Sequence, residues 1–187
     1  MTKAKRPAPA PQETFPATAQ RGADLRYAVE TGSLGPVLVA AGARGLAAIL
    51  LGDTAEALIR DLRRRFPAAV LRTGDREIAR WAARVVAFIE APQRGLDLPL
   101  DPSGTEFERR VWQALGAIPP GAVASYGEIA ARIGAPHAAR AVARACAANP
   151  LAVAIPCHRI RRADGGPGGY RWGLARKAAL LAREAAA

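Results

Sequence analysis

The chain is poor in the residues that build metal centres and disulfide frameworks. Of its 187 residues, two are cysteine and two are histidine, and no CxxC pair occurs. Two cysteines cannot supply the four ligands of a tetrahedral zinc site without distant help. A disulfide between Cys146 and Cys157 is not expected in an intracellular protein. We therefore expect neither a metal site nor a structural disulfide.

Long hydrophobic runs are also missing. Half of the residues are hydrophobic, yet no apolar run approaches the roughly 20 residues that a helix needs to cross a bilayer. The N-terminal segment alternates proline and alanine and has no apolar core of the kind found in signal peptides. We interpret residues 1–22 as a disordered tail, and we expect a cytoplasmic protein without a membrane partner.

Acidic residues are outnumbered, with 16 Asp and Glu against 27 Lys and Arg and a net charge of +11. The excess is greater in the second half, where residues 103–187 carry 12 basic and 5 acidic side chains. A basic face is the electrostatic footprint of a phosphate-binding protein. Arginines that merely solvate helix faces would give the same balance, so charge alone does not decide between the two interpretations.

The first half has the pattern of a small α/β domain. Short apolar runs at residues 25–29, 37–41 and 45–50 are separated by glycine-containing turns, which predicts a three-stranded antiparallel meander. Helical spacing follows over residues 54–66 and 75–90, and Asp53-Thr54 is the predicted N-cap of the first of these helices. We assign residues 23–100 to this domain and find no reactive group of residues in it.

The second half is predicted to be mostly helical. After a linker of turn residues at 99–104, Thr105 and Glu108 have the spacing of a capping box, and Ser125 is a second helix cap. Further helices are predicted at 138–148 and at 173–184. We assign residues 101–187 to a C-terminal domain.

Two of these helices have the spacing of a helix-turn-helix, with a turn that begins at Gly134. In the second helix only Arg140 and Arg144 could reach a base edge, whereas small residues such as Ala139 and Ala141 would allow close approach to a duplex. This pattern favours a binder whose affinity comes from phosphates and DNA shape. A helical hairpin buried in a core is the alternative.

Cys157 and His158 lie side by side in a proline-flanked apolar run. A thiolate is a far better nucleophile than a thiol, and a neighbouring imidazole or cation favours the thiolate at neutral pH. We therefore predict an ionised, reactive Cys157. Cys146 sits among alanines in a predicted helix, and we interpret it as a small, buried core residue.

Several motifs stand in one order along the chain: Asn149-Pro150, Ile155-Pro156-Cys157-His158-Arg159-Ile160, Gly169-Tyr170-Arg171-Trp172-Gly173 and Arg176-Lys177. Together with Gly104-Thr105, Val111-Trp112-Gln113 and Ser125-Tyr126, they resemble the O6-alkylguanine-DNA alkyltransferases, and most of all their Ada-like branch. The resemblance runs from about residue 25 to the end. It implies an α/β protein with a small N-terminal ribonuclease H-like domain and a mostly helical, winged-helix or helix-turn-helix-like C-terminal domain.

The resemblance also implies a role for each matching catalytic residue. Cys157 would be the nucleophile, and His158 would be the general base, acting through one water. Glu184 would hydrogen-bond to His158 and stabilise the imidazolium. Asn149 would tie the recognition helix to the active-site loop, and Tyr126 would donate a proton or hydrogen bond to the departing guanine.

The remaining roles concern the DNA and the pocket. By the resemblance, Arg140 would fill the stack after the nucleotide is flipped, with Ala139, Ala141 and Arg144 also at the DNA. The substrate pocket would involve Pro156, Ile160, Tyr170 and Arg171. Arg171 and Trp172 are larger than the residues of some relatives, which leaves open whether bulky alkyl groups fit.

The resemblance implies a DNA-repair enzyme that moves a methyl or alkyl group from O6-alkylguanine in duplex DNA to its own cysteine, once and without a cofactor. O4-methylthymine would be a second substrate, and we expect a monomer. Two alternatives stay open: a non-catalytic protein that recognises alkylguanine, and a Cys-His-Glu hydrolase with a basic surface. No zinc ligands or regulatory modules of the family are recognisable, so a transcriptional role is not expected.

Overall fold

The apolar runs of the first half form a four-stranded sheet. In the computed structural model, which describes residues 24–186, β1 (Asp24–Gly32), β2 (Gly35–Gly42) and β3 (Gly45–Leu51) pair antiparallel. This confirms the predicted meander. A fourth strand, β4 (Val70–Thr73), lies parallel to β1 and completes the order β3-β2-β1-β4. The prediction of three strands was therefore incomplete, because four mostly exposed residues carry no detectable alternation.

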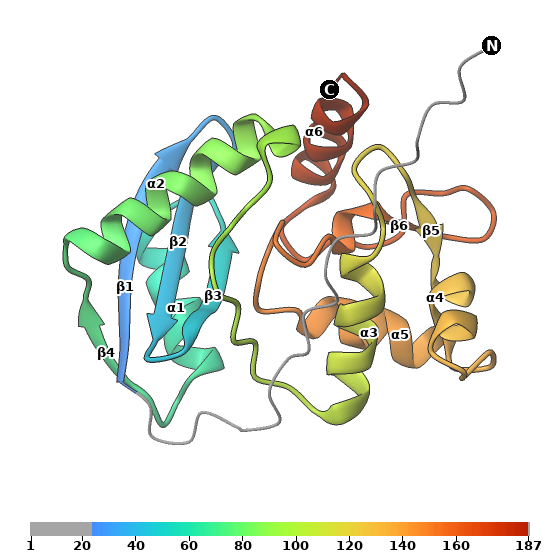
Figure 1. Cartoon of the computed structure of the whole chain (residues 1–187), viewed down its shortest axis with the longest axis horizontal. Coiled ribbons are helices and arrows are strands. Elements are labelled where there is room, and N and C mark those ends of the chain that lie inside the picture. The colour runs from blue at the N-terminus through green and yellow to red at the C-terminus, as the bar shows by residue number, and fades with distance from the viewer. Residues whose placement is uncertain (1–23, 187) are drawn as a thin grey trace, which may run out of the picture.

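Two helices cover the sheet. Helix α1 (Ala55–Arg65) is capped by Thr54, as the sequence predicted. Helix α2 (Arg76–Glu90) lies in its predicted range and is capped by Asp75. The two helices lie on opposite faces of the sheet (Figure 1), so every residue of β3 is buried. A strand covered on both faces reads as a continuous apolar run rather than an alternating one. The short 3-10 helix η1 (Pro92–Arg94) then leads the chain away from the sheet.

The second half is helical, and the predicted α/β fold class is confirmed. The capping box predicted at Thr105 and Glu108 forms at the start of α3. The predicted cap Ser125 starts α4 and is also part of a capping box, with Glu128. A short parallel pair of strands joins the loop before α4 to the loop after the 3-10 helix η2. The elements are α3 (Glu106–Gly116), β5 (Ala124–Ser125), α4 (Tyr126–Arg132), α5 (Ala139–Ala148), η2 (Cys157–Arg159), β6 (Ile160–Arg161) and α6 (Leu174–Ala185).

Backbone hydrogen bonds join the two halves along the edge of β3. Ile49 donates to the Pro150 carbonyl at 2.9 Å, and its own carbonyl accepts from Ala152 at 2.9 Å. Near the start of the strand, Leu46 is hydrogen-bonded in the same way to the linker at Pro99 and Asp101. The loop that leads to Cys157 is therefore attached to the sheet like an additional, very short strand.

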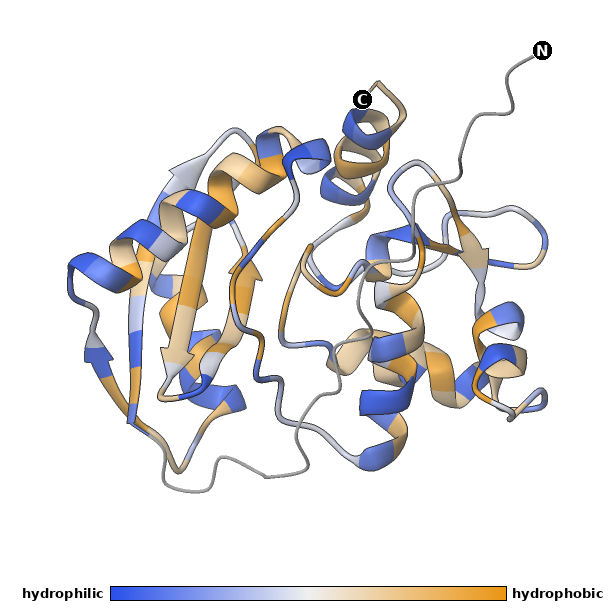
Figure 2. Cartoon of the chain, viewed as in Figure 1, coloured by the Kyte–Doolittle hydropathy of each residue, from blue (hydrophilic) through white to orange (hydrophobic). Residues whose placement is uncertain are grey.

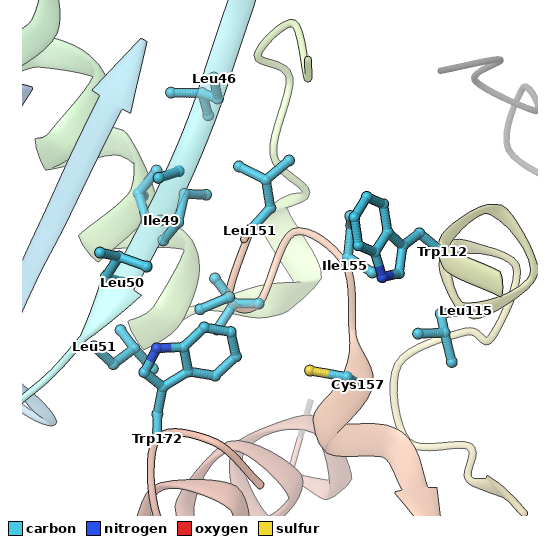
Figure 3. Packing of buried hydrophobic residues seen from close by; sticks show 14 of the residues in the cluster. Leu46, Ile49, Leu50, Leu51, Trp112, Leu115, Leu151, Ile155, Cys157 and Trp172 are labelled. Carbon is cyan, nitrogen blue, oxygen red and sulfur yellow. The ribbon is translucent and has the colours of Figure 1, made fainter. Parts of the chain in front are cut away.

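One hydrophobic core runs through both halves. Figure 3 shows it passing from Leu46 and Ile49 on β3, through Leu151 and Ile155 of the loop, to Trp112 of α3. Apolar residues gather on the strands and on the inner sides of the helices, and hydrophilic residues lie outside (Figure 2). The domain boundary predicted near residue 100 stays a prediction, because the hydrophobic core continues from one half of the chain to the other.

The same loop carries a strained residue. Val153 has a φ of 62° and is 3% exposed, although a β-branched side chain strongly disfavours the left-handed region. Such a conformation costs roughly 1–3 kcal/mol and persists only where the surroundings determine it. Here the attachment of Leu151 to β3 on one side and the rigid Pro156 on the other hold the bend.

Within residues 24–186, no helix is long and apolar enough to span a membrane. In the same part of the chain, no group of three or more His, Cys, Asp or Glu side chains is placed to hold a metal ion. The tail predicted at residues 1–22 lies outside the described part of the chain.

We predict that Leu151→Ala destabilises the whole molecule, by about 3 kcal/mol, because it opens a cavity in the core between the sheet and the helices. Urea unfolding followed by tryptophan fluorescence and by circular dichroism should show one coincident transition at lower urea. Leu174→Ala is the control, since Leu174 is 53% exposed and should change stability by less than about 0.5 kcal/mol. Two separate transitions in Leu151→Ala would contradict a shared core.

Candidate active site

Cys157 is the first residue of η2, and its side chain is buried with 4% of the residue exposed. Its Sγ accepts a hydrogen bond from Asn149 Nδ2 at 3.2 Å. The same amide donates to the Ile155 carbonyl at 2.9 Å, and Asn149 Oδ1 accepts from the backbone of Leu151 at 2.8 Å. Asn149 therefore connects the end of α5, the loop and the sulfur.

The resting sulfur is a thiol. Burial raises the pKa of Cys157 to about 11, and the hydrogen bond from Asn149 and the positive charge of Lys177 offset only part of that effect. The prediction that Cys157 is ionised at neutral pH is wrong for the protein alone. The physical reason is that the neighbouring imidazole is itself buried and uncharged, so it supplies no positive charge to hold a thiolate.

His158 is positioned as a base rather than as a cation. Burial lowers its pKa, although the contact with Glu184 opposes that shift. Its Nε2 lies 2.8 Å from Glu184 Oε1, and a carboxylate can only accept, so Nε2 carries the proton of the neutral ring. The lone pair is then on Nδ1, which is buried and has no hydrogen-bond partner among residues 24–186.

Glu184 is held in place by a second residue, Arg159, whose role the sequence did not predict. Arg159 Nε donates to both carboxylate oxygens, at 3.1 and 3.0 Å, and Nη2 donates to Oε1 at 2.8 Å. Its Nη1 donates to the Ile118 carbonyl. Burial would raise the pKa of Glu184, but the hydrogen bonds from His158 and Arg159 hold it at about 2. The carboxylate is therefore charged at neutral pH.

A cavity of about 280 Å³ opens beside the sulfur. It lies between α5, the start of α4 and the loop before α6. Burial raises the pKa of Tyr126 above its ordinary value, so its phenol keeps its proton and can donate. The lining residues are Tyr126, Ala143, Cys146, Ala147, Cys157, Gly169, Tyr170 and Arg171.

Cys146 and Gly168 both lie next to this cavity. Cys146 lies in α5 and packs against the core as predicted, but it is only partly buried, because it also lines the cavity. Gly168 has a φ of +65°, and a Cβ there would lie 3.0 Å from the Tyr126 hydroxyl. Glycine at this position therefore lets the loop approach Tyr126 closely.

Two predicted pocket residues, Pro156 and Ile160, are buried near the cavity but do not line it. The Ile160 carbonyl already accepts a hydrogen bond from Lys177 Nζ, which also donates to the Pro167 carbonyl. Lys177 is 1% exposed. The sequence shows Lys177 in the Arg176-Lys177 motif but predicts no role for it, because a lysine on a helix is normally solvent-exposed.

The predicted DNA-facing residues lie on α5 and are not among the residues that line the cavity. Arg140 and Arg144 are exposed, while Ala139 and Ala141 are partly buried. No ion pair is formed by either arginine with another of the described residues. Helices α4 and α5, with the intervening turn, have the predicted helix-turn-helix order and leave both guanidinium groups available to phosphate.

Comparison with known proteins gives a consistent result. Residues 106–186 match the family model for the 6-O-methylguanine DNA methyltransferase, DNA binding domain. The Escherichia coli bifunctional transcriptional activator/DNA repair enzyme Ada is 50% identical over 161 residues, which are 86% of this chain and 46% of Ada. The chain thus spans about half the length of that relative.

Two smaller relatives are matched over most of their length. A methylated-DNA–protein-cysteine methyltransferase of Mycolicibacterium paratuberculosis is 50% identical over 117 residues, 60% of this chain and 71% of that protein. The crystal structure of Mycobacterium tuberculosis OGT in complex with DNA superposes with a TM-score of 0.69 at 34% identity, over 86% of this chain and 93% of that one. By sequence and by fold, this chain belongs to the methylated-DNA–protein-cysteine methyltransferase family.

Proposed function

We propose that this protein repairs O6-alkylguanine in duplex DNA by transferring the alkyl group to Cys157 once, without a cofactor. The observation that carries the proposal is the buried group of Asn149, Cys157, His158 and Glu184 at the wall of a cavity beside the helix-turn-helix. The family membership supports the same activity. The partner is double-stranded DNA bound by one copy of the protein, and O4-methylthymine is a second substrate to be tested.

In the proposed reaction the Sγ–carbon bond forms as the carbon–O6 bond of the lesion breaks. The thiol proton passes through one water to His158 Nδ1, and Glu184 stabilises the resulting imidazolium. Tyr126 donates a proton to the guanine, which therefore leaves as a neutral base. The proton gained by His158 replaces the one lost by Tyr126, and no external acid or base is consumed.

The target atom is inaccessible inside a duplex, so the nucleotide must leave the stack to reach the cavity. In this proposal Arg140, exposed on α5, fills the gap and offsets part of the unstacking cost. The small residues Ala139 and Ala141 let the helix approach the groove, and Arg144 contacts phosphate. The thioether formed on Cys157 has no good leaving group, so each molecule reacts once.

We predict that a titration of duplex carrying O6-methylguanine reaches a plateau at one methyl group per protein molecule. Intact-mass and peptide mass spectrometry should place the added methyl on Cys157. Cys157→Ser should bind the duplex and gain no mass. Repeated turnover would favour the hydrolase alternative, and binding without transfer in the wild-type protein would favour the non-catalytic one. A duplex with O4-methylthymine tests the second substrate in the same way.

Arg140→Ala should slow repair of the methylated duplex by about tenfold, because the extruded nucleotide loses the side chain that replaces it in the stack. The rate with free O6-benzylguanine should change less than about twofold, since no stack is opened. Arg144→Ala is the control: it should weaken duplex binding and its salt dependence without this difference between substrates. Equal losses on both substrates would contradict the stack-filling role of Arg140.

The rate of methyl transfer should depend weakly on pH between 7 and 9. The raised pKa of Cys157 keeps it protonated there, and His158, whose pKa is lowered, is already neutral and able to take the proton. The transfer rate should fall only at pH values below the ordinary histidine pKa of about 6.5, because burial lowers the pKa of His158 and delays its protonation. Labelling of Cys157 in the free protein by iodoacetamide should instead rise about tenfold per pH unit from 8 to 10, because it needs the thiolate. A methyl-transfer rate that rises equally steeply would mean that the thiolate forms before His158 acts.

A further inference from the structure

Helix α1 belongs to the sheet-containing half, yet it reaches both walls of the cavity. Its Asp61 accepts from Arg171 Nη2, at 3.0 Å through Oδ1 and 3.3 Å through Oδ2. Arg171 lies in the loop before α6 and lines the cavity. One turn of helix away, Arg65 Nη1 donates to the carbonyl of Ala148, the last residue of α5, at 3.4 Å. Helix α5 is the opposite wall.

The two contacts share one carboxylate. Asp61 Oδ2 accepts from Arg65 Nε at 3.3 Å, and Oδ1 also accepts from Arg64 at 2.8 Å. The side chains of Asp61 and Arg65 are 15% and 13% exposed, and that of Arg171 is 35% exposed. Pairs that are this sheltered are screened less by solvent than ordinary surface ion pairs. Three guanidinium groups would otherwise repel one another at this point.

The loop before α6 is rich in glycine. Between β6 and α6 it contains five glycines, at positions 165, 166, 168, 169 and 173, and glycine leaves the backbone many accessible conformations. Several contacts hold its backbone: Trp172 is buried in the core and its carbonyl accepts from Arg176 Nη1 at 3.1 Å, Lys177 holds the Pro167 carbonyl, and Gly168 lies against Tyr126. At its cavity end, the side chain of Arg171 is held by Asp61.

We propose that Asp61 is a positioning residue for the active site, which sets the separation of the two cavity walls from the other half of the chain. It draws the Arg171 guanidinium outward, so that the backbone of the Tyr170–Arg171 segment forms the wall and the side chain stays out of the cavity. Through Arg65 it fixes the end of α5 next to Asn149. This inference rests on the proposed function, because the cavity is assigned to the flipped base.

We expect a substitution of Asp61 to lower the rate of methyl transfer without lowering the affinity for DNA, whereas a general loss of stability would lower both. Asp61→Asn removes one negative charge beside three arginines, so affinity for unmodified duplex should stay the same or increase. The maximal rate of methyl transfer at saturating DNA should fall by about tenfold, because a wall displaced from the reacting geometry is costly to rate rather than to DNA binding. Asp61→Glu keeps the carboxylate and should recover most of the rate.

The matched control is Asp53→Asn. Asp53 Oδ1 accepts a hydrogen bond from Arg176 Nη2 of α6 at 2.6 Å. This ion pair, like that of Asp61 and Arg171, links the two halves of the chain, but neither of its residues lines the cavity. This variant should leave both the transfer rate and the duplex affinity unchanged. Hydrogen exchange should be faster over residues 168–173 in Asp61→Asn and unchanged in Asp53→Asn.

A double-mutant cycle completes the test. If Asp61 acts through Arg171, the transfer rate of Asp61→Asn/Arg171→Gln should be no lower than that of the slower single variant. Losses that multiply, or equal rates in Asp61→Asn and Asp53→Asn, would overturn the proposal. Absence of methyl transfer in the wild-type protein would instead overturn the proposed function, and the hydrogen-exchange comparison would still decide whether Asp61 orders the loop.

Discussion

The buried carboxylate of Glu184 is the interaction on which the active site depends. It lies in the last helix, and its oxygens are shared by His158, Arg159 and the backbone of Gly121. Because it stays ionised, it selects the imidazole tautomer with the lone pair on Nδ1. Arg159 neutralises it, so a charge that would be costly to bury becomes a fixed acceptor. The orientation of the base next to Cys157 thus follows from a residue close to the end of the chain.

The protonated state of Cys157 is consistent with this arrangement. A permanent thiolate in an apolar site would need a permanent cation, and the imidazole is neutral until it takes a proton. Cys157 and His158 together can form an ion pair when the reaction requires it, with Asn149 and Lys177 as fixed dipole and charge nearby. The thiol is meanwhile less open to oxidation and to chance alkylation than an exposed thiolate would be.

Local rules predicted much of the fold. The helix caps at Thr105 and Ser125 and the apolar stripes of the helices depend on neighbouring residues, and the structure has them where the sequence placed them. Strand β4 was missed because its stability comes from pairing with β1, not from its own pattern. The site shows the same division. The Cys-His motif is visible in the sequence, whereas the ionisation of Cys157, the cavity position of Cys146 and the partners of Arg159 and Lys177 depend on segments distant along the chain.

The attachment of the active-site loop to β3 has a consequence for association between molecules. An exposed strand edge can template pairing with another chain, and β3 is the long, apolar edge of this sheet. Residues around Leu151 and Leu100 occupy that edge at two points, so a foreign strand cannot add there without displacing the segment that carries the proposed nucleophile, Cys157. The other edge, β4, has four residues with mostly exposed side chains. The apolar edge of β3 is thus covered by the segment that carries the proposed active site, so uncovering the edge would also disrupt that site.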